Sequence, residues 1–249
     1  LSGVAERLER LGELALARSV QQRLFPERVP RLPYLQASGV CLPARTVSGD
    51  YYDFIPIRGG MDVVVADVSG KAMSAALLMA SVHAALRSQY PVHDEDAPDP
   101  GAILVRLNQH LHATLEPTRF VTLFLVRVLD DGRVLYGNAG HNPAALVRDG
   151  SIEWLQSGGL LLGPFAGARF ESTRLAARAA DVICLYTDGV TEAESPEGEH
   201  FGEERLAAAL HDGRHLEPQA LQEAIVRRVR DWQGAAEPTD DLTLVVLRL

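Results

Sequence analysis

Two hairpin patterns constrain the fold of this chain more than any other feature of its sequence. In each, two apolar, β-prone runs flank a tight turn. The patterns cover residues 51–68, with Gly59-Gly60 at the turn, and residues 120–138, with Asp130-Asp131-Gly132 at the turn. Turns this short join neighbouring antiparallel strands, because a parallel connection needs a crossover of a dozen or more residues. The chain is therefore expected to contain antiparallel sheet.

The rest of the chain supplies further strands and two pairs of helices. Apolar periodicity predicts helices over residues 73–90, 102–115, 203–211 and 218–232, and strands over residues 35–42, 144–148, 152–155, 170–175, 182–186 and 242–249. Because the strands do not alternate regularly with the helices, a doubly wound parallel sheet is disfavoured. The residues alone thus predict an α+β fold in which helices pack on antiparallel sheet.

The first 25 residues form a separate helical pattern. Apolar residues recur at alternating three- and four-residue steps, at Leu1, Val4, Leu8, Leu11 and Ala15. This seam has two interpretations: a helix packed on its own domain, or a signalling or dimerising helix that enters from an upstream domain. Pro26, Pro30 and Pro33 then end the helix. We therefore divide the chain into an N-terminal regulatory or linker helix, residues 1–33, and a main domain, residues 34–249.

Charge and composition narrow the function classes. The formal net charge of -9 disfavours nucleic acid as a partner, because phosphate backbones require a clustered basic surface. The longest apolar runs, such as residues 73–80 and 121–126, are too short to cross a bilayer. Cys41 and Cys184 lie in apolar strand-like runs and are expected to be reduced core thiols of a cytoplasmic protein. Because the sequence begins at Leu1 rather than Met, we expect it to be cut from a longer protein.

Several aspartates stand where apolar strands end. They are Asp50 and Asp53 in SGDYYDF, Asp67 in ADVSGKA, Asp188 in YTDGVTE, and Asp240 and Asp241 in TDDLT. A carboxylate at the rim of a buried sheet needs a partner for its charge, and hard divalent cations such as Mg²⁺ and Mn²⁺ take oxygen ligands. A single Asp-Gly pair is more often only a turn. From the residues alone, the pattern predicts a carboxylate–metal site of unspecified chemistry.

Five motifs in a fixed order carry a resemblance to a known family. They are SGDYYDF, ADVSGKAMSAALLMA, NAGHNP, LYTDGVTEA and TDDLT, and the helical segment ARSVQQRLFPERVP precedes them. In this order they resemble the bacterial RsbU- and SpoIIE-like branch of the metal-dependent protein phosphatases (type 2C, or PPM). The resemblance implies a sandwich of two antiparallel sheets flanked by helix pairs (αββα). It also implies that residues 34–249 are a phosphatase catalytic domain.

The resemblance further implies a centre of two Mg²⁺ or Mn²⁺ ions and assigns its ligands. Asp67 would bridge both ions, and the other ligands would be the carbonyl oxygen of Val68 and the carboxylates of Asp50, Asp188 and Asp240. Asp241 and Asp53 match positions that support such a site rather than ligate the metal.

Three further residues have roles that the resemblance leaves less defined. Ser69 stands where eukaryotic relatives place a histidine as general acid, so the proton donor is unassigned. Arg45, five residues before Asp50, corresponds to a phosphate-binding arginine of some relatives, although an exposed loop arginine is the commoner case. For His141 in NAGHNP, a structural role that fixes the loop is favoured over an acid–base role.

Two positions depart from the pattern of the branch. Ser48 and Ala72 stand where glycine is usual. Both residues are small, so we expect altered loop strain rather than a lost site.

The activity implied by the resemblance is hydrolysis of phosphoserine or phosphothreonine by a metal-activated water. The usual substrate in this branch is a phosphorylated anti-anti-sigma factor, and the N-terminal helix would transmit activation from an upstream sensor domain or activator, or through a homodimer. Two alternatives belong to other classes: a catalytically silent interaction module with the same fold, and metal-dependent nucleotide chemistry. The second is disfavoured because the chain has no GxxxxGK[ST] phosphate loop.

Overall fold

The computed structural model of the protein describes residues 2–29, 32–70, 72–91, 96–156 and 158–249. The helices are α1 (Ser2–Gln22), α2 (Met73–Arg87), α3 (Pro100–Thr114), α4 (Asp188–Thr191), α5 (Gly202–Gly213) and α6 (Pro218–Gln233). The strands are β1 (Gln36–Leu42), β2 (Tyr51–Ile57), β3 (Gly60–Val68), β4 (Val121–Leu129), β5 (Val134–Ala139), β6 (Ala144–Arg148), β7 (Ser151–Leu155), β8 (Thr173–Leu175), β9 (Val182–Tyr186) and β10 (Leu242–Arg248). No described helix is both long enough and apolar enough to span a membrane.

The strands form two antiparallel sheets of five strands each. The first, named here the β1 sheet, has the order β1-β10-β9-β6-β7, and the second, named the β2 sheet, has the order β2-β3-β4-β5-β8. Both predicted hairpins are present, as β2–β3 and β4–β5. In the first hairpin Ile57 pairs with Gly60, so the turn is Arg58-Gly59 rather than Gly59-Gly60. Gly59 has a φ of 67°, a conformation that favours glycine.

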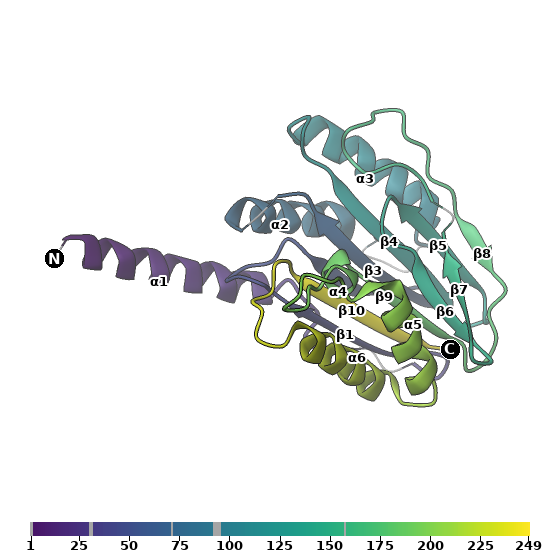
Figure 1. Ribbon diagram of the computed structural model, residues 1–249. Helices are drawn as coiled ribbons and strands as arrows, with labels where there is room; N and C mark the ends of the chain where they lie inside the picture. Colours follow the sequence, from purple (N-terminus) through teal and green to yellow (C-terminus); the bar gives the residue numbers. More distant parts are fainter. Residues whose placement is uncertain (1, 30–31, 71, 92–95, 157) are drawn as a thin grey trace.

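The two sheets pack face to face, and helices cover their outer faces (Figure 1). One apolar core lies between the sheets and includes Phe54, Val63 and Leu185. A second core lies between the β2 sheet and helices α2 and α3, and a third lies between the β1 sheet and helices α5 and α6. This αββα arrangement confirms the predicted α+β fold.

Several elements differ from the sequence prediction. Helix α1 ends at Gln22 rather than at about residue 25. Strand β8 covers Thr173–Leu175 instead of residues 170–175, because Phe170 is buried in the core beneath α2 and α3. Helix α2 ends at Arg87 rather than at residue 90, and the Tyr90 hydroxyl donates a hydrogen bond to Asp62. Helix α4 was not predicted, because four residues are too few to show a helical period.

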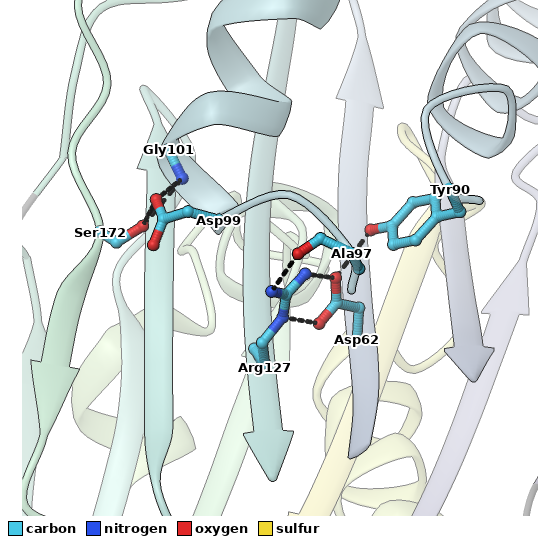
Figure 2. A network of polar contacts seen from close by, with 7 residues as sticks. All are labelled: Asp62, Tyr90, Ala97, Asp99, Gly101, Arg127 and Ser172. Atoms are coloured by element: carbon cyan, nitrogen blue, oxygen red, sulfur yellow. Dashed lines mark hydrogen bonds and ion pairs between the residues drawn. The ribbon is translucent and has the colours of Figure 1, made fainter. Parts of the chain in front are cut away.

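A buried polar network fastens the connection between α2 and α3 to the β2 sheet (Figure 2). Arg127 on β4 donates two hydrogen bonds, each of 2.7 Å, to the two carboxylate oxygens of Asp62 on β3. The Tyr90 hydroxyl donates to the same carboxylate at 2.9 Å, and Arg127 also reaches the carbonyl oxygen of Ala97 at 3.4 Å. Asp99 then caps α3 by accepting from the amide of Gly101 at 2.9 Å. The network therefore orders the chain on both sides of this connection.

Helix α1 extends away from the sandwich (Figure 1). The described members of the predicted heptad seam, Leu11 and Ala15, are exposed, whereas Leu1 and the side chains of Val4 and Leu8 lie outside the described residues. The described part of the seam is thus not packed on its own domain. After the helix, Phe25 and Val29 pack against the core between the sheets. The division of the chain at residues 33 and 34 stays a prediction.

Candidate metal centre

The predicted acidic residues stand at strand ends of both sheets. Asp50 directly precedes β2 and Asp67 lies near the end of β3, in the β2 sheet. Asp188 follows β9, and Asp240 and Asp241 precede β10, in the β1 sheet. The face-to-face packing of the sheets therefore brings carboxylates from both layers to one end of the sandwich.

Two glycines allow the segments that carry these residues to approach closely. A Cβ atom on Gly49 would lie 3.1 Å from the carbonyl oxygen of Val68 and 4.0 Å from Oδ1 of Asp67. A Cβ atom on Gly189 would overlap the carbonyl oxygen of Asp241. A larger residue at Gly189 would force the start of β10 away from α4, so the close approach explains glycine there.

Asp241 joins the two sheets at this end by hydrogen bonds. Its Oδ1 accepts from the amide of Ala44 at 2.8 Å. Its Oδ2 accepts from the hydroxyl of Ser48 and from the amide of Gly49, each at 2.8 Å. Asp241 thus fixes the loop that leads into Asp50, and its role in supporting a metal site stays a prediction.

Asp50 is held from the opposite sheet. The hydroxyl of Thr187, at the end of β9, donates to Oδ2 of Asp50 at 2.6 Å. The oxygen of that hydroxyl accepts in turn from the amide of Thr243 on β10 at 3.0 Å. Because Asp50 is only 2% exposed, these bonds fix the direction of a carboxylate that has little access to water.

The carboxylates raise one another's pKa. Burial raises the pKa of Asp67 to about 7, and neighbouring negative charges, first Asp188 and then Asp240, add to the shift. Burial and the charge of Asp67 also raise the pKa of Asp50 well above its ordinary value. The pKa of Asp188 is raised by burial and then by the charge of Asp240. Since such effects need close neighbours, acidic residues of both sheets share one site.

The negative charge of these carboxylates has no cationic partner within the described residues. None of the ion pairs there includes Asp50, Asp67, Asp188 or Asp240. In the same ranges, no three acidic, histidine or cysteine side chains are close enough together to hold a metal ion as they stand. The atoms offered are all oxygens, and Mg²⁺ and Mn²⁺ prefer oxygen donors. In charge and donor chemistry the residues therefore fit the predicted cations.

Asp53 contacts a different part of the fold from the one predicted. Its two carboxylate oxygens accept hydrogen bonds from Arg87, each at 2.7 Å, and the Tyr51 hydroxyl donates to the same carboxylate. Asp53 is fully buried, and Arg87 is the last residue of α2. The ion pair ties β2 to α2, so these contacts give no support to a role for Asp53 beside the metal ligands.

His141 joins the two sheets through both of its ring nitrogens. Nδ1 lies 2.7 Å from the Thr122 hydroxyl oxygen on β4, and Nε2 lies 3.1 Å from the Tyr186 carbonyl oxygen on β9. A carbonyl oxygen can only accept, so we infer that Nε2 carries the proton and that Nδ1 accepts from Thr122. Burial lowers the pKa of His141 to about 4. A neutral ring with both nitrogens occupied supports the predicted structural role over an acid–base role.

The segment that follows Asp67 is fastened to the residues before β4. The hydroxyl oxygen of Ser69 accepts from the amide of Phe120 at 2.8 Å, and Arg119 donates to the Ser69 carbonyl oxygen at 2.9 Å. Ser69 therefore orders the loop between β3 and α2. Arg45 is exposed, in the loop that Asp241 fixes, and its role in phosphate binding stays a prediction.

Comparison with known proteins assigns the chain to a family. Residues 58–249 match the family described as Stage II sporulation protein E (SpoIIE). The chain belongs to the SpoIIE family. The matched region includes four of the acidic positions described above: Asp67, Asp188, Asp240 and Asp241.

Three known proteins are similar to this SpoIIE-family chain. It is 28% identical over 258 residues to the phosphoserine phosphatase RsbU of Bacillus subtilis, covering 100% of the chain and 72% of RsbU. It is 29% identical over 261 residues to protein IcfG of Synechocystis sp., covering 94% of the chain but only 41% of IcfG. The SiaA-PP2C domain of Pseudomonas aeruginosa has the same fold, with a TM-score of 0.87 at 22% identity over 98% of this chain and 99% of that one. The family and the fold confirm the predicted class, a protein phosphatase of the PP2C (PPM) type.

The two departures from the family pattern have different structural consequences. Ala72 has φ 59° and ψ -135° directly before α2, which confirms the predicted strain. Ser48 is not among the described residues with positive φ, so the prediction of strain there is wrong. Its side chain is fully buried, and its hydroxyl adds the hydrogen bond to Asp241.

Three residues at the site were missed from the sequence: Gln21, Arg119 and Thr187. Their hydrogen bonds reach partners 27, 50 and 137 residues away in the chain. Only Thr187 carried a local signal, because it directly precedes Asp188 in the YTDG motif.

Proposed function

We propose that this chain hydrolyses phosphoserine or phosphothreonine in a regulatory phosphoprotein, with two Mg²⁺ or Mn²⁺ ions held by the carbonyl oxygen of Val68 and the carboxylates of Asp50, Asp67, Asp188 and Asp240. The observation that carries the proposal is a group of mutually repelling carboxylates, drawn from both sheets, with no counter-charge among the described residues. The SpoIIE-family membership supports phosphoryl chemistry at this group.

The residues of the chain would act mainly by positioning. When bound, the cations would supply Lewis-acid activation of a water and would neutralise the phosphoryl oxygens. Asp241 holds the loop before Asp50, and Thr187 orients the Asp50 carboxylate. Donors that are already oriented need little reorganisation during the reaction, which is a large source of rate in such sites. His141 does not supply the leaving-group proton in this proposal, because both of its ring nitrogens are already bonded.

The proposed substrate is a protein phosphorylated on serine or threonine, of the anti-anti-sigma type. The similarity to RsbU, a phosphoserine phosphatase, supports this choice. We place the reaction in the cytoplasm, where such a regulator would be found.

Helix α1 is proposed to receive the regulatory input. Leu11, Leu16 and Val20 are 55%, 66% and 57% exposed on a helix that extends away from the sandwich (Figure 1). Apolar side chains exposed together on one element favour association. An upstream domain, an activator or a second copy of the helix would cover them.

The alternatives have less support. A silent interaction module has no need of mutually repelling carboxylates, whose assembly is unfavourable without a cation. No observation in the structure favours nucleotide chemistry.

Phosphate release from a phosphoserine peptide tests the proposal. We expect release by the wild-type chain with Mn²⁺ or Mg²⁺, none with a chelator, and none by Asp67→Asn, because the bridging carboxylate would be lost. The matched control is Asp131→Asn, in the exposed turn between β4 and β5, which should behave as the wild type. Release that survives chelation, or full activity of Asp67→Asn, would refute the assignment. Absence of release from both the peptide and a phosphoprotein would favour the silent module.

A further inference from the structure

The side chain of Gln21 binds the main chain of a residue beside the candidate metal centre. Gln21 lies one residue before the end of α1 and is only 7% exposed. Its Nε2 donates to the carbonyl oxygen of Ser48 at 2.7 Å, and its Oε1 accepts from the amide of Ser48 at 2.9 Å. One side chain thus satisfies both backbone groups of Ser48, as a neighbouring strand would.

Ser48 in turn contacts two acidic residues of the candidate metal centre. Its hydroxyl donates to Oδ2 of Asp241 at 2.8 Å and accepts from the amide of Asp50 at 3.0 Å. Ser48 itself is fully buried. A shift of its main chain would therefore disturb both a predicted metal ligand and the carboxylate that supports the loop.

Gln21 is also the polar link between α1 and the sandwich. Among the described residues, its two bonds are the only side-chain hydrogen bonds that join α1 to the rest of the chain. The next residue, Gln22, has the same chemistry but is exposed. The chain therefore contains its own matched control.

We propose that Gln21 is a positioning residue of the metal centre: by fixing the main chain of Ser48, it orients Asp50 and Asp241 and couples the end of α1 to the carboxylates. The inference rests on the proposed function for the identity of the site. Residues that orient metal ligands without touching the metal commonly change its affinity by roughly 10- to 100-fold when they are replaced. A residue that only anchors α1 would change stability without changing that affinity.

The test compares Gln21→Met with Gln22→Met and the wild type. Methionine keeps the length and packing of the side chain but makes neither bond to Ser48. Three quantities are measured: the dissociation constant for Mn²⁺ by calorimetry, kcat and KM on a phosphoserine peptide at saturating and limiting Mn²⁺, and the melting temperature in chelator. We expect Gln21→Met to weaken Mn²⁺ binding by roughly 10-fold or more and to lower kcat, with the peptide KM little changed. Gln22→Met should match the wild type in all three.

The outcomes separate this inference from the proposed function. Wild-type affinity for Mn²⁺ in Gln21→Met would overturn the positioning role of Gln21, whether or not the melting temperature falls. If the wild type binds Mn²⁺ but releases no phosphate, the proposed activity fails, while the comparison of Mn²⁺ affinities still decides the role of Gln21. If Gln21→Met does not fold, Gln21→Glu takes its place, since it keeps the acceptor for the Ser48 amide and removes the donor to the Ser48 carbonyl. A wild type that binds no Mn²⁺ would overturn both.

Discussion

At the scale of single residues, His141 illustrates how burial selects a role. Its ring contacts Thr122 of the β2 sheet and the Tyr186 carbonyl of the β1 sheet, and its amide is bound by Asn138 at 2.8 Å. A neutral ring satisfies both contacts, because Nε2 donates to the carbonyl and Nδ1 accepts from Thr122, and burial disfavours the charged ring. The residue most expected to exchange protons near neutral pH therefore serves to join two layers.

The lowered pKa of His141 predicts a pH dependence of stability. The folded protein keeps the ring neutral to about pH 4, whereas the unfolded chain binds the proton below about pH 6.5. The unfolded state thus holds more protons between these values, so the stability contributed is complete above pH 6.5 and is lost as pH falls towards 4. Urea unfolding of the wild type and of His141→Gln, at pH 7 and at pH 4.5, measures this contribution to stability. The gap in unfolding free energy between the two should be larger at pH 7. An equal gap at both values would contradict the pKa assignment.

Residues at the site differ in how far the sequence alone can identify them. The aspartates could be predicted because each lies in a short motif whose neighbours are adjacent in the chain. Gln21 could not, because a glutamine in a helix acquires its partner only when the tertiary fold forms. Thr187 had one local signal, its place directly before Asp188, but its bond to Asp50 also depends on the tertiary fold. Asp53 was instead assigned to the site because it shares a motif with Asp50. Side chains three residues apart in extended chain point to opposite faces of a sheet. The Asp53 carboxylate therefore reaches α2.

At the scale of elements, the start of α2 carries backbone strain. Ala72 has φ 59° and ψ -135°, a region that glycine enters freely and that other residues avoid. The strained residue lies five positions after Asp67, in the loop that Ser69 and Arg119 hold in place. The fixed loop therefore imposes the strain on Ala72.

Replacing Ala72 with glycine should relieve this strain. We expect Ala72→Gly to raise the free energy of unfolding by about 1 kcal/mol, the lower end of the cost of such a conformation. The control is Ala84→Gly at an exposed position inside α2, which should lower the same quantity by about 1 kcal/mol because glycine is a poor helix former. Denaturant unfolding of both variants in chelator measures the two effects. A loss of stability in Ala72→Gly as large as in Ala84→Gly would show that Ala72 is not strained.

The hairpins were the most predictable elements, because each depends on residues within about twenty positions of one another. The pairing of β1 with β10 could not be predicted, since it joins the first strand of the chain to the last. Nor does local pattern show that β9 and β10 are neighbours in one sheet while β2 and β3 lie in the other. The family resemblance implied a sandwich of two antiparallel sheets, which the structure confirms, and the structure assigns each strand to its sheet.

At the scale of the whole molecule, the candidate site depends on how the two sheets pack. Asp50 and Asp67 come from the β2 sheet, and Asp188 and Asp240 from the β1 sheet, so neither layer holds the set alone. Asp241, Thr187 and His141 each bond across the gap. Helix α1 reaches the same end through Gln21. A movement of one layer, or of α1, would therefore change the distances between the proposed ligands.

The most direct test of the central claim is a calorimetric titration of the metal-free protein with Mn²⁺, compared between the wild type and Asp67→Asn, with Asp131→Asn as the control. We expect saturable binding of about two ions by the wild type and by Asp131→Asn, as in a two-metal site, and loss of that binding in Asp67→Asn. Mn²⁺ binding by Asp67→Asn with the stoichiometry and affinity of the wild type would contradict the claim that these carboxylates form the metal centre.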